Sequence, residues 1–143
     1  MEQHEALREI MRNLERKMGV LEFKLQVDGL NITFAQCHAL VEIGRAKTLS
    51  LIRLSEILEL EAPTVSRTVD RLVNAQLVNR NTDPSNRRYI TISLTEDGEK
   101  VFHEIENTMN LRFKRILQNI PENKQDEVID NIKVLTTAIQ SLE

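Results

Sequence analysis

The sequence predicts a mainly α-helical fold with one small β-hairpin. Three observations support this prediction. Near both ends of the 143-residue chain, apolar residues recur at intervals of four and three, as they do in amphipathic helices. Short segments in the middle begin with residues that cap helices. Next along the chain, β-branched runs flank the turn-forming stretch "DPSN", which is typical of a hairpin.

The first segment predicts one long amphipathic helix over 5–27, ending near "DGLN" at 28–31. Its apolar seam consists of Leu7, Met11, Leu14, Met18, Leu21 and Leu25. Two interpretations of this seam stay open: it packs against the protein's own core, or it pairs with a second copy of the chain. Both can hold on different parts of the helix.

Two shorter helices follow, over 33–46 and 50–60. Thr33 and Gln36 have the spacing of a capping box, in which each side chain binds the other residue's backbone N–H. Ser50 is an N-cap residue for the second of these helices.

A further helix begins near Pro63, a residue that suits the first helical turn. It has one apolar stripe, formed by Val65, Val69, Leu72 and Val73. The opposite stripe is polar and holds Pro63, Arg67, Asp70, Arg71 and Asn74. One face is therefore predicted to be buried, and the other is free to meet a partner.

After the hairpin, Thr95 is expected to cap a helix that runs from Glu96 to Pro121. The last helix follows from Glu122. It has a second seam at four- and three-residue intervals, formed by Val128, Ile132, Leu135, Ile139 and Leu142. The chain shows no internal repeat.

Composition excludes several classes of protein. No apolar run approaches the roughly 18 residues of a membrane span, and the charged N-terminus does not resemble a secretory signal. The single cysteine, Cys37, excludes an internal disulfide. We therefore expect a cytoplasmic protein without a membrane partner. The sequence also has no glycine-rich phosphate loop and no nucleophile–base pair, so we expect neither an enzyme nor a cofactor.

Charge is segregated along the chain. Residues 62–90 contain five arginines and two aspartates, whereas the whole chain has a net charge of −3. A basic patch on an otherwise acidic protein indicates a polyanion as partner.

Two short helices joined by a tight turn and followed by a hairpin form a winged helix-turn-helix. The polar stripe of the second helix fits the major groove of double-stranded DNA. Its first turn holds the short residues Thr64 and Ser66, where free N–H groups favour phosphate. Arg87 and Arg88, at the hairpin tip, can enter a minor groove or lie on the backbone. A winged helix used only for protein interaction, without DNA binding, is the alternative.

Residues 62–98, "APTVSRTVDRLVNAQLVNRNTDPSNRRYITISLTEDG", resemble the MarR family of bacterial transcription regulators. The most specific parts are "TVSR", "DRL", "LV.R", "P.N.RR" and "LT..G". The resemblance implies one MarR-like domain over 1–143, with a winged lobe over 33–95 and dimerisation helices over 5–27 and 96–142.

The resemblance also implies that Ser66 and Arg67 reach bases and that Arg88 enters the minor groove. The full set of expected DNA-binding residues is Pro63, Thr64, Ser66, Arg67, Arg71, Arg87 and Arg88. The expected dimer interface contains Leu7, Met11, Leu14, Val128, Ile132, Leu135 and Ile139. The partners implied are a second copy of the chain and a pseudo-palindromic operator.

Three positions depart from the family pattern. Asn86 replaces an aspartate that can hold the wing arginine. Gln76 replaces the glycine that often ends the recognition helix. A residue other than glycine in the left-handed backbone conformation costs about 1 kcal/mol. The turn before that helix is "ELE", and its Glu59 and Glu61 can repel phosphate.

The resemblance further implies a repressor that a small-molecule effector releases from DNA. His38 and His103 are the candidate residues of an effector pocket. A metal- or redox-responsive regulator of the same fold is the alternative. For the redox version, Cys37 is expected to be a buried, inert thiol, and for the metal version a histidine-rich stretch is missing. We therefore expect no metal site.

Overall fold

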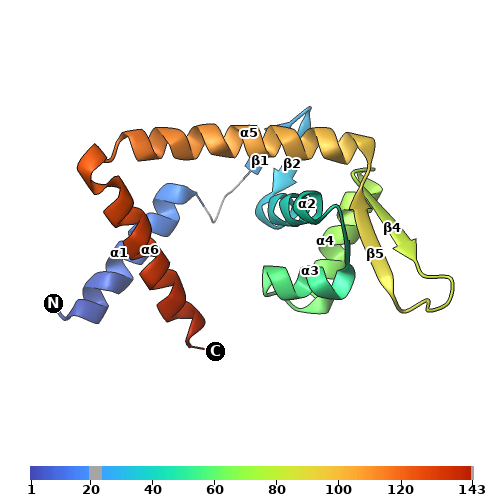
Figure 1. Ribbon diagram of the computed structural model, residues 1–143, viewed down its shortest axis with the longest axis horizontal. Coiled ribbons are helices and arrows are strands. Elements are labelled where there is room, and N and C mark those ends of the chain that lie inside the picture. Colours follow the sequence, from blue (N-terminus) through green and yellow to red (C-terminus); the bar gives the residue numbers. More distant parts are fainter. Residues whose placement is uncertain (20–23, 143) are drawn as a thin grey trace. The chain divides into compact units, whose positions relative to one another are not determined.

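The computed structural model describes residues 1–19 and 24–142, which form two compact units with a boundary between Ile105 and Glu106 (Figure 1). The boundary lies within the longest helix. In chain order the elements are α1 (Gln3–Met18), β1 (Lys24–Val27), β2 (Leu30–Thr33), α2 (Phe34–Ala46), β3 (Thr48–Ser50), α3 (Leu51–Leu58), α4 (Ala62–Asn74), β4 (Val78–Thr82), β5 (Ile90–Leu94), α5 (Glu96–Gln118), the short 3-10 helix η2 (Glu122–Lys124) and α6 (Gln125–Gln140).

The expected first helix over 5–27 is wrong in its second half. Helix α1 ends at Met18, and Gly19 follows in the left-handed conformation with φ of 71°. Leu25, which completes the heptad spacing, lies in strand β1 instead. Leu21 lies outside the described residues.

Strands β1 and β2 form an antiparallel hairpin that the sequence reasoning missed. Asp28 and Gly29 make its two-residue turn, and both have positive φ, 49° and 77°. This is the conformation that Asp-Gly favours between hairpin strands. Val27 and Ile32 are each 3% exposed, so the hairpin contributes to the core.

Helices α2, α3 and α4 pack against one another, and a three-stranded antiparallel sheet in the order β3-β5-β4 lies beside them (Figure 1). The predicted caps are confirmed. Thr33 and Gln36 form both bonds of a capping box, and the Ser50 hydroxyl accepts the backbone N–H of Arg53. The predicted hairpin is also confirmed as β4 and β5, which gain β3 as a third strand.

The buried stripe of α4 is as expected for three of its four residues. Val65 and Val69 are 0% exposed and Leu72 is 1% exposed, whereas Val73 is half-buried. The polar stripe, from Pro63 to Asn74, is exposed at all five predicted positions. This burial pattern fixes which face of α4 is turned outward.

Thr95 joins the end of α4 to the start of α5. Its hydroxyl donates to the carbonyl of Gln76 at 2.7 Å and accepts the N–H of Gly98 at 3.0 Å, while its own N–H donates to the carbonyl of Leu77. A Cβ atom on Gly98 would collide with the same Leu77 carbonyl. These contacts explain "LT..G" physically: the threonine caps α5, and the glycine admits the neighbouring backbone.

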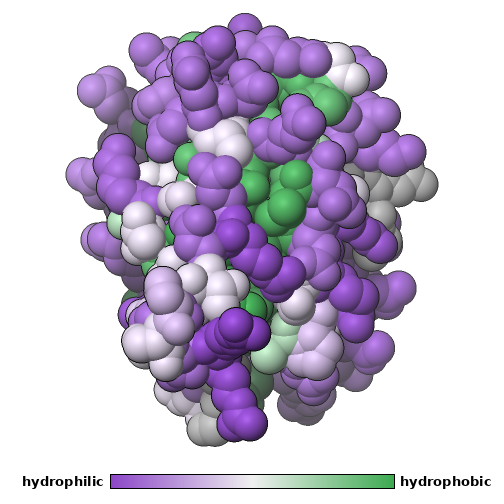
Figure 2. Space-filling model, turned by 90° about the vertical axis from the view of Figure 1, so that its right-hand side faces the viewer, coloured by the Kyte–Doolittle hydropathy of each residue, from purple (hydrophilic) through white to green (hydrophobic). Residues whose placement is uncertain are grey.

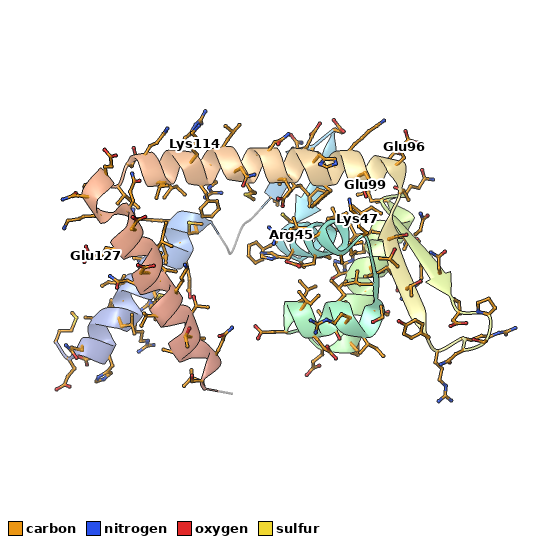
Figure 3. The ribbon with its side chains drawn as sticks, in the orientation of Figure 1. Arg45, Lys47, Glu96, Glu99, Lys114 and Glu127 are labelled. Atoms are coloured by element: carbon orange, nitrogen blue, oxygen red, sulfur yellow. The ribbon has the colours of Figure 1, made fainter. Side chains whose placement is uncertain are left out.

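Charges at helix ends are placed favourably for the helix dipole. Glu96 and Glu99 project from the first turn of α5, and Arg45 lies in the last turn of α2 (Figure 3). Lys114 and Glu127 lie further along the chain, on α5 and α6 (Figure 3).

Helices α1 and α6 have no buried residue among those that the structure describes. Leu7 and Leu14 are 47% and 49% exposed on α1, and Ile132 is 56% exposed on α6. The apolar seams are therefore present, but these side chains remain largely exposed to solvent in the single chain. Within the described residues, no helix is long and apolar enough to cross a membrane.

Candidate nucleic-acid interface

The helix-turn-helix consists of α3, the turn 59–61 and α4. Arg67 and Arg71 lie on the outward face of α4 and are exposed. The Nη2 of Arg67 lies 3.4 Å from the hydroxyl oxygen of Thr64, one turn earlier, which is at the outer limit of a hydrogen bond. Arg71 has no side-chain partner among the described residues. Both guanidinium groups are thus available to an anionic partner.

Asp70 does not pair with Arg67, although the two are three residues apart on the helix. It pairs with Arg80 of β4 instead. The Nη2 of Arg80 also donates to the hydroxyl of Ser66 at 3.2 Å. A single arginine of the hairpin therefore holds two side chains of α4. Sequence reasoning counted Arg80 in the basic patch but gave it no role.

The wing tip, residues 83–89, joins β4 to β5 and exposes Arg87 and Arg88. Asn86 does not hold the Arg88 guanidinium. Its side-chain oxygen accepts the backbone N–H of Arg88 at 3.2 Å, and its carbonyl accepts the N–H of Tyr89 at 2.9 Å. Asn86 thus shapes the backbone of the tip and leaves the side chain of Arg88 without a partner among the described residues.

Asp83 fixes the start of this loop. One oxygen of its carboxylate accepts the hydroxyl of Ser85 at 2.7 Å and the backbone N–H of Ser85 at 2.8 Å. These hydrogen bonds hold the pKa of the Asp83 carboxyl below its usual value, because they favour the charged form. The loop is therefore pinned by a carboxylate that is ionised at neutral pH.

Two of the departures from the family pattern place a residue other than glycine in the left-handed conformation. Gln76 has φ of 64° two residues after the end of α4, and Glu59 has φ of 55° directly after α3. Gln76 therefore adopts the conformation expected of the glycine that it replaces. Glu59 and Glu61 are both exposed beside the first turn of α4.

The face on the side of the β4–β5 wing is mostly hydrophilic, and its apolar side chains lie between polar ones (Figure 2). Such a surface suits a polar, charged partner better than an apolar protein partner.

The two candidate effector residues, His38 and His103, both lie on the surface. His38 is exposed and lies against Phe34, with ring centroids 4.4 Å apart. His103 is also exposed, and its Nε2 lies 3.8 Å from a carboxylate oxygen of Glu99. Cys37 is 6% exposed, as expected of a buried thiol. Within 1–19 and 24–142, no group of three His, Cys, Asp or Glu side chains could hold a metal ion.

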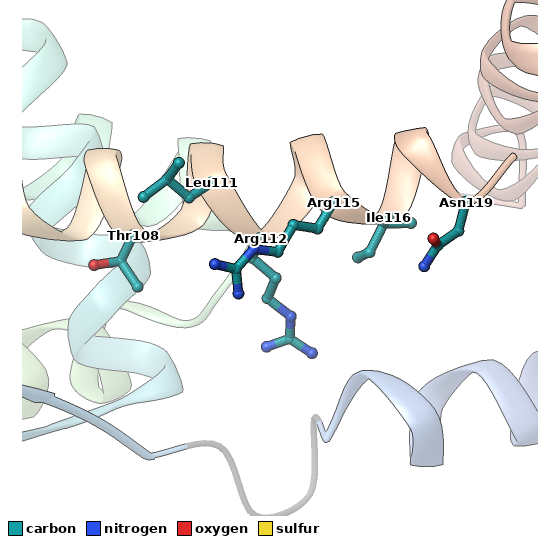
Figure 4. A pocket seen from close by; sticks show the side chains of 6 residues that line it. All are labelled: Thr108, Leu111, Arg112, Arg115, Ile116 and Asn119. Carbon is teal, nitrogen blue, oxygen red and sulfur yellow. The ribbon is translucent and has the colours of Figure 1, made fainter. Parts of the chain in front are cut away.

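A pocket of about 400 Å³ lies along one face of α5 within the second unit (Figure 4). Its lining is Thr108, Leu111, Arg112, Arg115, Ile116 and Asn119. Leu111 and Ile116 are 58% and 39% exposed there. Sequence reasoning did not select these residues, because the spacing of α5 is less regular than that of the two seams.

Comparison with known proteins identifies the family that this chain resembles. Residues 32–90, from β2 to the start of β5, match the MarR family model. The chain is therefore similar to the MarR family over its winged lobe. It is 22% identical over 142 residues to the uncharacterized HTH-type transcriptional regulator YfiV of Bacillus subtilis, covering 92% of this chain and 89% of the relative.

Solved structures show the same fold. FabT of Streptococcus pneumoniae, in complex with DNA, superposes with a TM-score of 0.78 at 18% identity, over 98% of this chain and 96% of FabT. BpsR of Bordetella bronchiseptica superposes with a TM-score of 0.75 at 19% identity, over 94% of this chain and 99% of BpsR. The MarR fold therefore extends over nearly the whole chain.

Proposed function

We propose that this protein is a MarR-family regulator that binds double-stranded DNA with α4 in the major groove and the β4–β5 wing on the adjacent minor groove or backbone. The observation that carries the proposal is the set of outward arginines: Arg67 and Arg71 on α4, and Arg87 and Arg88 on the wing. They are exposed, and residues 62–90 carry five arginines against two aspartates in a protein of net charge −3, which favours a polyanion at this surface. The relative FabT has been solved in complex with DNA.

Selection of bound duplexes from a random pool tests this proposal directly. A dimer with two reading helices predicts a pseudo-palindromic motif whose half-sites lie about one helical turn apart. Affinity for the selected duplex should fall steeply as salt rises, because phosphate contacts release counterions. Failure to enrich any motif, together with binding no stronger than to random DNA at low salt, would leave a protein-interaction module as the better function.

Two substitutions separate base reading from backbone contact. Arg67→Ala should weaken binding to the selected duplex by about 1–3 kcal/mol and relax one base pair in each half-site. Arg88→Ala should weaken binding to all duplexes more evenly and reduce the salt dependence. Lys124→Ala, which removes an exposed cation outside α4 and the wing, is the matched control. Equal effects of both arginine variants on every duplex would contradict this division.

We propose that the active form is a homodimer that covers the exposed apolar seams of α1 and α6 and the apolar face of α5. Leu135→Asp should produce monomers that bind the selected duplex poorly, because a carboxylate cannot be buried in an apolar interface without a partner. Thr137→Asp introduces the same charge on the opposite face of α6 and should stay dimeric. Sedimentation velocity distinguishes the two, and a dimeric Leu135→Asp variant would show that the seam is not the interface.

We further propose that the protein is a repressor that a small organic effector releases. For BpsR, 6-hydroxynicotinic acid regulates DNA binding. A panel of aromatic acids and phenols, added to the complex with the selected duplex, provides the test. Loss of the response in His38→Ala and His103→Ala, with DNA affinity unchanged, would place the effector near these histidines. A response that survives both substitutions would move the pocket elsewhere.

A further inference from the structure

Arg80 connects the wing to the reading helix. It lies in β4, and its guanidinium contacts Asp70 and Ser66, which are one helical turn apart on α4. Its side chain is 28% exposed, whereas that of Asp70 is 51% exposed. The Nε of Arg80 is buried and has no hydrogen-bond partner among the described residues. A buried donor without an acceptor costs stability, so stability alone is a poor reason for this arginine.

The first consequence concerns charge on the DNA-facing stripe. Asp70 is the only carboxylate on the outward stripe of α4, between Arg67 and Arg71. Unpaired, it would repel phosphates or bind Arg67, which lies three residues earlier on the same helix. Because Arg80 holds the carboxylate, the acidic group is neutralised and Arg67 stays available.

The second consequence concerns Ser66. Its hydroxyl oxygen accepts a hydrogen bond from Nη2 of Arg80, which occupies a lone pair and leaves the O–H free to donate. A serine held in this way matches acceptors in the major groove, such as the N7 and O6 atoms of guanine or the O4 atom of thymine, rather than an amino group.

We propose that Arg80 is a positioning residue for DNA reading, which acts through Asp70 and Ser66 rather than by touching DNA. This inference rests on the proposed DNA binding. In its strongest form, it predicts that removing Asp70 makes Arg80 largely dispensable for affinity. If Arg80 instead contacts phosphate directly, its removal should weaken DNA binding even when Asp70 is absent.

The test compares wild type, Arg80→Met, Asp70→Asn and the double variant on the selected duplex at fixed salt. Arg80→Met should bind about tenfold more weakly, since an unpaired carboxylate then faces the DNA. Asp70→Asn should bind at least as tightly as wild type. The double variant should recover most of the lost affinity, which a direct contact or a general folding defect would not allow.

A double variant as weak as Arg80→Met, or Arg80→Met as tight as wild type, would overturn the inference while leaving the proposed DNA binding intact. Wild type without affinity for any duplex would overturn both. Thermal unfolding of the free proteins identifies a variant that fails to fold. In that event Arg80→Gln replaces Arg80→Met, because glutamine also removes the charge that neutralises Asp70 but keeps a polar side chain at this partly buried position.

Duplex selection with the double variant tests the role of Ser66 separately. Affinity should return, but the preference for an acceptor-bearing base at the position facing Ser66 should weaken, since nothing orients the hydroxyl. An unchanged base preference would show that Arg80 does not set the donor direction of Ser66, and that part of the inference would fail.

Discussion

The winged lobe and the terminal helices use similar apolar spacing with opposite results. In α4, Val65, Val69 and Leu72 are at most 1% exposed. On α1 and α6, Leu14 and Ile139 occupy equivalent stripe positions and are each 49% exposed. The lobe therefore completes its own core within one chain, whereas the terminal helices carry stripes that a single chain leaves open. Periodicity identifies an apolar face but does not say which surface covers it.

The largest expected effect comes from a substitution in the buried core of the winged lobe. Leu40 of α2 is 0% exposed, and Leu40→Ala should lower the free energy of unfolding by about 2–5 kcal/mol through lost burial and a cavity. Urea unfolding at two protein concentrations measures this loss, which should be the same at both. Ile52→Ala in the same lobe, at a side chain that is 63% exposed, should change the free energy by no more than about 0.5 kcal/mol. Similar losses for both variants would contradict the division into core and surface.

The next largest effect concerns the close contact between the start of α5 and the backbone of the winged lobe. Gly98→Ala should lower the free energy of unfolding by about 1–3 kcal/mol, because the added methyl group collides with the Leu77 carbonyl. Lys100→Ala, at an exposed position two residues later on the same helix, is the control and should be close to neutral. Thermal unfolding compares the two. A neutral Gly98→Ala would mean that the backbone relaxes at little cost.

A smaller effect, of opposite sign, tests local strain inside the lobe. Gln76→Gly should raise the free energy of unfolding by about 1 kcal/mol, since Gln76 holds φ of 64° and glycine adopts that conformation without a clash. Ala75→Gly, at φ of −80°, should instead be destabilising. Chemical unfolding of the two neighbouring variants gives the contrast, and a destabilised Gln76→Gly would show that the glutamine side chain contributes more than the strain costs.

The smallest effect concerns the wing and pH. Because the pKa of Asp83 is lowered in the folded protein, its stabilising hydrogen bonds are fully present above the usual carboxyl pKa of about 3.9 and are lost as pH falls through the lower folded value. Ser85→Ala should move the pKa of Asp83 back up toward its usual value. An NMR titration of the carboxyl carbon measures the change. Ser141→Ala, directly after the last helix, should leave the titration as it is, and a Ser85→Ala titration identical to wild type would assign the shift to another cause.

Local signals in the sequence were sufficient for much of the fold. Thr33, Gln36 and Ser50 mark helix starts because capping is a contact within four residues. The β1–β2 hairpin was missed because Leu25 satisfies two patterns at once. It continues the heptad spacing of α1, and it also alternates with Val27 along a strand. The turn signal Asp28-Gly29 is compatible with both the end of a helix and the turn of a hairpin.

The site was only partly predictable. The outward position of Arg67 and Arg71 follows from the helical period alone. The pairing of Arg80 with Asp70 and Ser66 joins residues 10 and 14 positions apart in the sequence, and it depends on how β4 packs against α4. No periodic pattern encodes such a contact, and helical spacing alone offers Asp70 only Arg67, three residues earlier, as a partner on the outward stripe.

The contacts of Thr95 have a kinetic consequence. The Thr95 hydroxyl caps α5 and donates to the carbonyl of Gln76, and the Thr95 N–H donates to the carbonyl of Leu77, so displacing Thr95 breaks hydrogen bonds at both helix ends. Fraying, which normally begins independently at each helix terminus, is thereby made concerted. Amide protons at the end of α4 and the beginning of α5 should exchange with solvent in a single opening event, as one foldon.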